Sequence, residues 1–149
     1  MDSLRALKHG LLLFWALWST IVFFTNVFDG LKAWGVIDRG WPLASGNYGL
    51  LARARSRVGA PRWVNDVAFG GATLWQGLTA ALFWRAVSHY RPARHDEAST
   101  AFAASAGMWA AFLVADELMV AYETGVEGAH MRILTAQLVS LLSIHLLPE

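Results

Sequence analysis

Four candidate metal ligands or acid–base residues lie late in the chain, at Glu117, Glu123, Glu127 and His130. Glu127 and His130 have E-x-x-H spacing, so on a helix both side chains project from one side, as in carboxylate-bridged metal bundles. Those bundles use two such motifs and two further Glu residues, whereas this chain has one motif. The spacing therefore predicts at most a single-metal site, with Glu123, Glu127 and His130 as its ligands. Glu117 is the alternative to Glu123 as a ligand, and Asp29 is a further candidate ligand.

Glu117 is the carboxylate that helical geometry directs toward a neighbouring helix. At 100° per residue it shares a face with the small and apolar residues Ala103, Ala106, Ala110 and Leu113. Small residues let another helix approach, so we expect this face to point into the bundle and Asp116 to lie nearer Trp109 and Phe112. A carboxylate inside a membrane costs on the order of 2.5–3.5 kcal/mol and needs a partner or a task. In an enzyme, Glu117 and His130 would be the acid–base pair; burial with a hydrogen-bond partner is the alternative.

The composition indicates that these groups belong to a membrane protein. The chain has 149 residues, of which 56% are apolar and 15% are charged, and its mean hydropathy is +0.39. A soluble domain has about a quarter charged residues. The absence of cysteine excludes disulfides, thiolate nucleophiles and cysteine-ligated metals, and a net charge of +1 gives no field to attract nucleic acid. These values exclude a disordered chain, a nucleic-acid binder and an ordinary cytosolic enzyme.

Four charge-poor stretches predict membrane-spanning helices at about residues 10–29, 64–86, 98–122 and 128–147, with a long loop at 30–62. A helix needs about 20 mainly apolar residues to cross the hydrocarbon. The first three stretches meet this length directly, and the fourth does so if its helix begins upstream, near Glu127 or His130. The first stretch is too long for a secretory signal core and no A-x-A-like site follows it, so we expect an uncleaved helix. The prediction is an all-α, integral membrane four-helix bundle, a single domain over residues 1–149.

The long loop contains an amphipathic segment at 47–58. On a helix, Tyr48 and Leu51 share one face of this segment, and Arg53 and Arg57 share another. This pattern predicts a short helix in the membrane interface, with its arginines toward lipid phosphates. An anchored loop whose arginines balance nearby acids is the alternative.

Four spans put both termini on the same side of the membrane, and the basic residues leave the orientation open. Lys and Arg residues divide almost evenly between the two sides, so the positive-inside rule does not decide. Aromatic rings that prefer the headgroup level flank the span ends at Trp34, Trp41, Trp63, Trp84 and Tyr90. The expected partners are membrane lipids and other membrane proteins, in a hetero- or homo-oligomer, and not nucleic acid.

Antiparallel packing of the four spans would bring many polar residues to one membrane face. The expected ligand-binding set is Asn26, Asp29, Asp66, Gln76, Glu117, Glu123, His130 and Gln137. Gln76 and Gln137 should lie deeper than the others, and Gln137 shares a helix face with His130 seven positions earlier. A structural hydrogen-bonded cluster and a pocket for a small amphiphile both fit this set.

The sequence requires no cofactor. Haem needs two histidines at similar depth, and only His9 and His145 qualify, both expected at the interface. The nucleophile motif G-x-S-x-G, the zinc-site motif H-E-x-x-H and Gly-rich phosphate loops are absent. The first expectation is therefore a non-catalytic accessory or structural subunit of a membrane complex. The alternatives are a lipid-like small-molecule binding protein or enzyme using Glu117 and His130, and, third, a metal-binding membrane protein.

Overall fold

The computed structural model describes residues 2–91, 95–118 and 126–148. Over these residues the chain forms five α-helices and no strands. The helices are α1 (Asp2–Ala33), α2 (Asn47–Arg57), α3 (Arg62–Ser88), α4 (Asp96–Leu118) and α5 (Val126–Leu146). The prediction of an all-helical chain is confirmed for the described residues, and the short helix α2 lies within the amphipathic segment 47–58.

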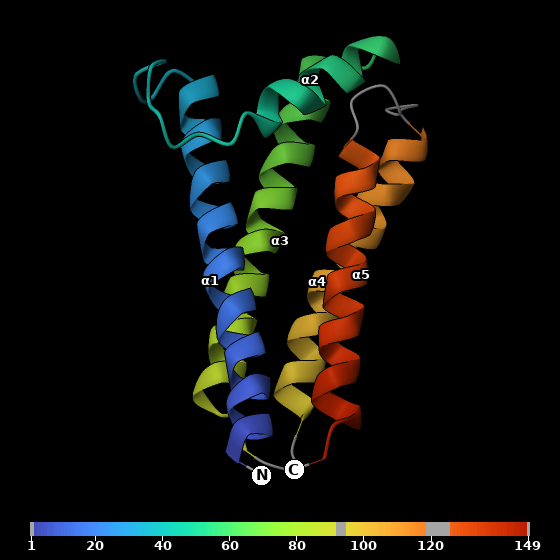
Figure 1. Cartoon of the computed structure of the whole chain (residues 1–149). Helices are drawn as coiled ribbons and strands as arrows, with labels where there is room; N and C mark the ends of the chain where they lie inside the picture. Colours follow the sequence, from blue (N-terminus) through green and yellow to red (C-terminus); the bar gives the residue numbers. More distant parts are fainter. Residues whose placement is uncertain (1, 92–94, 119–125, 149) are drawn as a thin grey trace.

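Four long helices run side by side, and α2 lies across one end of them (Figure 1). α1 packs mainly against α3, and α4 packs mainly against α5. The two pairs meet through α3 and α4, whereas α1 and α5 touch only slightly. Both termini lie at the end opposite α2, where Nζ of Lys8 donates a hydrogen bond to the Leu147 carbonyl oxygen at 2.8 Å. The bundle thus consists of two helical pairs.

The hydrophobic core lies in the half of the bundle nearest the termini. Trp15, Phe83 and Phe102 come from three different helices and form its centre, with ring centroids 4.9 to 6.5 Å apart. The other buried members are Leu12, Ala16, Ala86, Ala98, Ala101 and Ile144. Alanines beside large rings let the helices approach while the rings fill the space between them.

Among the described residues, two helices are long and apolar enough to cross a membrane, Ser3–Ala33 within α1 and Asp96–Leu118. Only 22% and 33% of their most apolar windows are buried, so most of this apolar surface faces outward. α3 and α5 do not reach the same mean hydropathy, so two helices rather than the predicted four meet this criterion. Large exposed apolar side chains nevertheless continue along α3 and α5, at Leu74, Leu78, Leu138, Val139 and Leu142.

The helices extend beyond the predicted spans at most ends, and the largest difference is at the start of α1. α1 begins at Asp2 rather than near residue 10, and its first turns are held by the contact between Lys8 and the end of α5. α5 begins at Val126, upstream of Glu127, as the last span required. α4 is described to Leu118, so the predicted end of that span at 122 lies outside the described residues.

Candidate functional site

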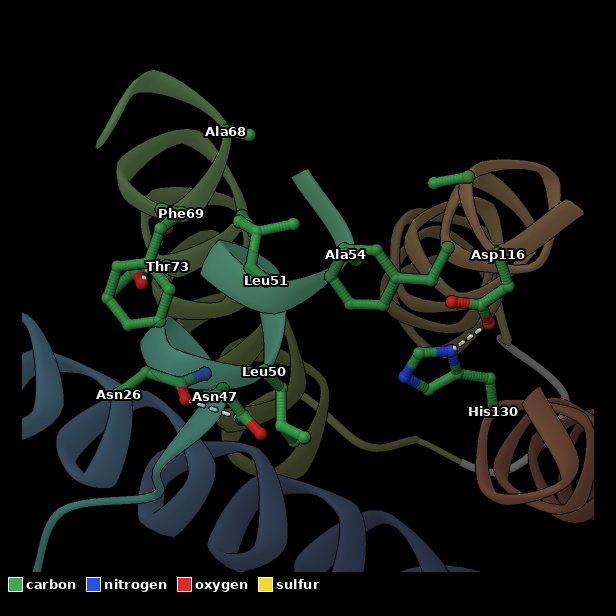
Figure 2. Close-up of a pocket in the computed structure, with 13 residues that line it drawn as sticks. Asn26, Asn47, Leu50, Leu51, Ala54, Ala68, Phe69, Thr73, Asp116 and His130 are labelled. Atoms are coloured by element: carbon green, nitrogen blue, oxygen red, sulfur yellow. Dashed lines mark hydrogen bonds and ion pairs between the residues drawn. The ribbon is translucent and has the colours of Figure 1, made fainter. Parts of the chain in front are cut away.

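A cavity of about 230 Å³ lies beneath α2, and all five helices contribute to its lining (Figure 2). Most of the lining is apolar, with Leu50, Leu51, Ala54, Ala68, Phe69, Ala72, Phe112 and Ala115. The polar lining residues are Asn26, Asn47, Thr73, Asp116 and His130. The space stays open because four of the lining residues are alanines, whereas large rings fill the other half of the bundle.

Asp116 of α4 and His130 of α5 form a hydrogen-bonded pair on one wall of the cavity. His130 Nδ1 lies 2.6 Å from Asp116 Oδ2, and the His130 and Asp116 side chains are 17% and 12% exposed. The imidazole lies against the rings of Trp109 and Phe112, with both centroid distances at 5.3 Å. When its carboxylate is ionised, Asp116 only accepts hydrogen bonds, and the shared hydrogen is then on Nδ1. In Figure 2 the other nitrogen, Nε2, points away from Asp116 and into the cavity.

Asp116, and not Glu117, is the carboxylate of α4 that lines the cavity. Glu117 is exposed, which corrects the expectation that it points into the bundle, and the carboxylate bonded to His130 is that of Asp116. The buried face of α4 consists of Ala98, Ala101, Phe102, Ser105, Met108 and Trp109. Asp116 follows Trp109 by seven residues and shares this face. Because large rings bury more apolar area than alanines, the helix turns its rings inward and leaves Ala103 and Ala110 exposed.

Asn26 and Asp29 lie together as expected, and both hold the start of α2. Asp29 Oδ2 accepts a hydrogen bond from the Tyr48 N–H at 2.7 Å. The Ser45 hydroxyl lies 2.8 Å from Asn26 Oδ1 and 3.1 Å from Asp29 Oδ2, and the Asn47 amide donates to Asn26 Oδ1 at 2.9 Å. A glycine with φ of 80° precedes α2 and offers no capping side chain. Asp29 therefore caps the positive end of α2 from a different helix.

Asp66 fastens α2 to α3. Its Oδ1 accepts hydrogen bonds from the Tyr48 hydroxyl at 2.5 Å and from the Trp34 indole at 3.3 Å. The Tyr48 ring also packs edge-on against Phe69, one of the lining residues, with centroids 5.3 Å apart. Tyr48 is thus bound at both its N–H and its hydroxyl, and α2 is held in place over the cavity. Asp66 itself does not line the cavity.

Gln76 and Gln137 lie in a polar layer and do not line the cavity. Gln137 Nε2 donates to Ser105 Oγ at 2.5 Å, and Gln76 Nε2 donates to the Ser19 carbonyl oxygen at 3.4 Å. All four residues are at most 2% exposed. At this level of the bundle, Ser19 Oγ, Trp109 Nε1 and Gln137 Oε1 are buried and have no hydrogen-bond partner among the described residues. Along each long helix this layer falls between the cavity and the aromatic core.

The residues of the metal hypothesis are only partly described. Glu123 lies outside the described residues, and Glu127 is half-buried at the start of α5. His130 uses Nδ1 for its bond to Asp116. Within residues 2–91, 95–118 and 126–148, no three His, Asp or Glu side chains lie close enough together to hold a metal ion.

The two histidines of the haem hypothesis contact different neighbours. His145 lies 2.9 Å from the Ser99 hydroxyl through Nε2, and its ring centroid is 5.1 Å from that of His95. The His9 ring packs instead against Tyr90, at 5.5 Å. Their rings therefore have different packing partners.

The candidate site is an apolar cavity that α2 covers, with one Asp–His pair in its wall. α2 forms the cover, and the α4–α5 pair supplies Asp116 and His130. No protein-family model matches the chain, and no curated protein or solved structure shows significant similarity to it.

Proposed function

We propose that this protein is a four-helix integral membrane protein that binds a small amphiphile in the cavity beneath α2. The observation that carries the proposal is an apolar cavity of about 230 Å³ into which the Asp116–His130 pair presents a nitrogen. An engineered cavity of about 150 Å³ in another protein binds benzene, so this one has room for a substituted ring or a short alkyl chain. Apolar walls with a few placed polar groups are typical of small-molecule sites.

Helix length and surface chemistry support the membrane part of this proposal. α5 is the shortest long helix, and its 21 residues span about 31 Å, close to the hydrocarbon thickness of about 30 Å. Large apolar side chains are exposed on all four long helices, for example Phe14, Leu74, Val114 and Leu142. Such a surface is favourable toward lipid and a liability toward water. In this proposal α2 lies in the interface, with Arg53 and Arg57 exposed.

Filling the cavity is expected to abolish binding. Ala72 lines the cavity, and Ala72→Leu puts a larger side chain into space that an occupant would need. Wild-type protein purified from its native membrane is expected to release about one small amphiphile per chain on organic extraction. The variant is expected to release less than about a tenth of that amount, as measured by quantitative mass spectrometry.

Ala111→Leu is the matched control for this experiment. It makes the same change on the exposed side of α4, away from the lining residues, and is expected to leave the extracted amount unchanged. Equal amounts from wild type and Ala72→Leu would contradict the proposed function, because the cavity would then not be the place where the molecule is held.

A second candidate function is an accessory subunit of a membrane complex, which an exposed small-residue face of α4 favours. This face consists of Ala103, Gly107, Ala110 and Ala111. Small residues let two helices approach closely within a membrane, where interhelical packing drives association. A helix of another subunit could therefore lie against α4 without disturbing the cavity.

Ala111→Leu is expected to weaken such an assembly. The larger side chain would hold a partner helix away from the α4 backbone, so contacts along the whole face would be lost. Native mass spectrometry from solubilised membranes should show wild type in a complex larger than the 16.4 kDa chain and the variant mainly as the single chain. A monomeric wild-type protein would contradict the accessory-subunit function and leave the amphiphile proposal intact.

A further inference from the structure

We propose that the molecule bound beneath α2 carries a hydroxyl group, as a phenol or alcohol does, and that this hydroxyl donates a hydrogen bond to His130 Nε2. This inference rests on the proposed function and names the chemical class of the ligand. It follows from three features of the cavity: the state of the histidine, its surroundings, and the bonds already made by the other polar lining residues.

Asp116 determines what His130 offers to a ligand. We assign an ionised Asp116 and a neutral His130, and in this state the 2.6 Å contact with Asp116 Oδ2 has its hydrogen on Nδ1. In the neutral imidazole the second nitrogen then has a lone pair and no hydrogen. Nε2 points into the cavity and makes no hydrogen bond to a described residue. The site therefore presents an acceptor that needs a donor.

The surroundings of Nε2 favour a neutral donor over an ion. The imidazole packs against Trp109 and Phe112, and the cavity lining is mainly apolar. A charged head group would lose its hydration there without a full set of partners, which is costly. An anion would in addition be repelled by the Asp116 carboxylate. A hydroxyl carries no charge and brings one donor, which is what an unpaired acceptor in an apolar wall requires.

Two of the other polar lining residues use a donor within the protein. Asn47 donates to Asn26 at 2.9 Å, and the Thr73 hydroxyl donates to the Phe69 carbonyl oxygen at 2.8 Å. These bonds hold α2 and α3 in their local geometry. We assign the orientation of the head group to His130 Nε2 because this nitrogen faces the cavity, and the His130→Phe variant distinguishes it from the Asp116 carboxylate.

The test compares two small probes that differ only at the head group. Wild-type protein in lipid nanodiscs is dialysed to equilibrium against 4-propylphenol or 4-propylanisole, with empty nanodiscs of the same lipid subtracted. The phenol donates a hydrogen bond, whereas its methyl ether does not. We expect the phenol to bind about tenfold more tightly than the ether, the usual worth of one hydrogen bond.

Two variants locate the preference on the Asp116–His130 pair. His130→Phe keeps a ring of similar shape but removes the acceptor, so both probes should bind with the affinity of the ether. Asp116→Asn removes the obligatory acceptor next to Nδ1 and lets the other imidazole tautomer form, so the preference should also be lost. Helix content and melting temperature are measured for each variant to confirm that it is folded.

The outcomes separate this inference from the proposed function. Equal binding of both probes to wild type would overturn the hydroxyl inference and leave amphiphile binding standing. Tighter binding of 4-propylbenzoate than of the phenol, or a preference that survives in folded His130→Phe, would also overturn it. Binding of none of the probes above empty nanodiscs would overturn the proposed function and this inference with it.

Discussion

Asp29→Ala is expected to detach the start of α2 and to speed tryptic cleavage within that helix about 100-fold. Asp29 is buried, and its carboxylate accepts the Tyr48 N–H at 2.7 Å and lies 3.1 Å from the Ser45 hydroxyl. Bonds to a charged acceptor contribute about 1.5–3 kcal/mol each, so their loss favours local opening by about 3 kcal/mol. Since 1.4 kcal/mol is about tenfold, that corresponds to the stated rate change. Trypsin is expected to cut the chain after Arg53 and Arg57. The cleavage rate is measured by gel electrophoresis with mass spectrometry.

Asp38→Ala is the control for this experiment. Asp38 lies in the loop between α1 and α2 and is exposed, and its carboxylate accepts the Gly40 N–H at 2.6 Å. Its removal should change the cleavage rate by less than about threefold, because exposed sites contribute little. Equal rates in both variants would show that the bonds of Asp29 do not hold α2 in place.

Phe83→Ala is expected to lower the free energy of unfolding by about 3 kcal/mol and to leave amphiphile affinity within about twofold. Phe83 is fully buried and contacts the rings of Trp15 and Phe102. The value is at the low end of the range for Phe→Ala, because lipid would solvate the ring in the unfolded state and only packing would be lost. Affinity should persist because the aromatic core and the cavity are separated by the polar layer.

Unfolding is measured by denaturant titration in mixed micelles, and affinity by the nanodisc dialysis described above. Phe14→Ala is the control, since Phe14 is 54% exposed on α1, and its effect should stay within about 0.5 kcal/mol. A loss of binding free energy in Phe83→Ala as large as its loss of unfolding free energy would contradict this prediction. It would show that the cavity depends on the aromatic core.

The sequence predicts where the helices of this protein lie along the chain better than it predicts which side of each helix faces inward. Apolar period and charge spacing indicate the long helices and the short α2, because these are local properties of the chain. α4 is apolar on nearly every side, so its sequence fits more than one inward face. A choice based on small residues favoured Glu117, whereas the structure turns Trp109 inward and with it Asp116. The larger rings were the signal that would have identified the correct carboxylate.

The polar residues show a different limit of sequence analysis. Their gathering at one end follows from antiparallel helices and was predictable for Asn26, Asp29 and Asp66. The roles of these residues were not predictable from the sequence. Capping of α2 by Asp29 depends on where the loop that ends in Gly46 places the start of α2. Leu51 illustrates the same limit, since its apolar face was assigned to the interface but lines the cavity.

The walls of the cavity belong to two helical pairs, since Asn26 and Phe69 come from α1 and α3, and Asp116 and His130 from α4 and α5. A bound molecule that touches both walls would add contacts between the two pairs. Because the molecule binds only the folded protein, its binding raises the free energy of unfolding and the melting temperature. The increase is about 2.7 kcal/mol when the free concentration of the molecule is one hundred times its Kd. In cells that lack the bound molecule, the protein would therefore be less stable and more readily degraded.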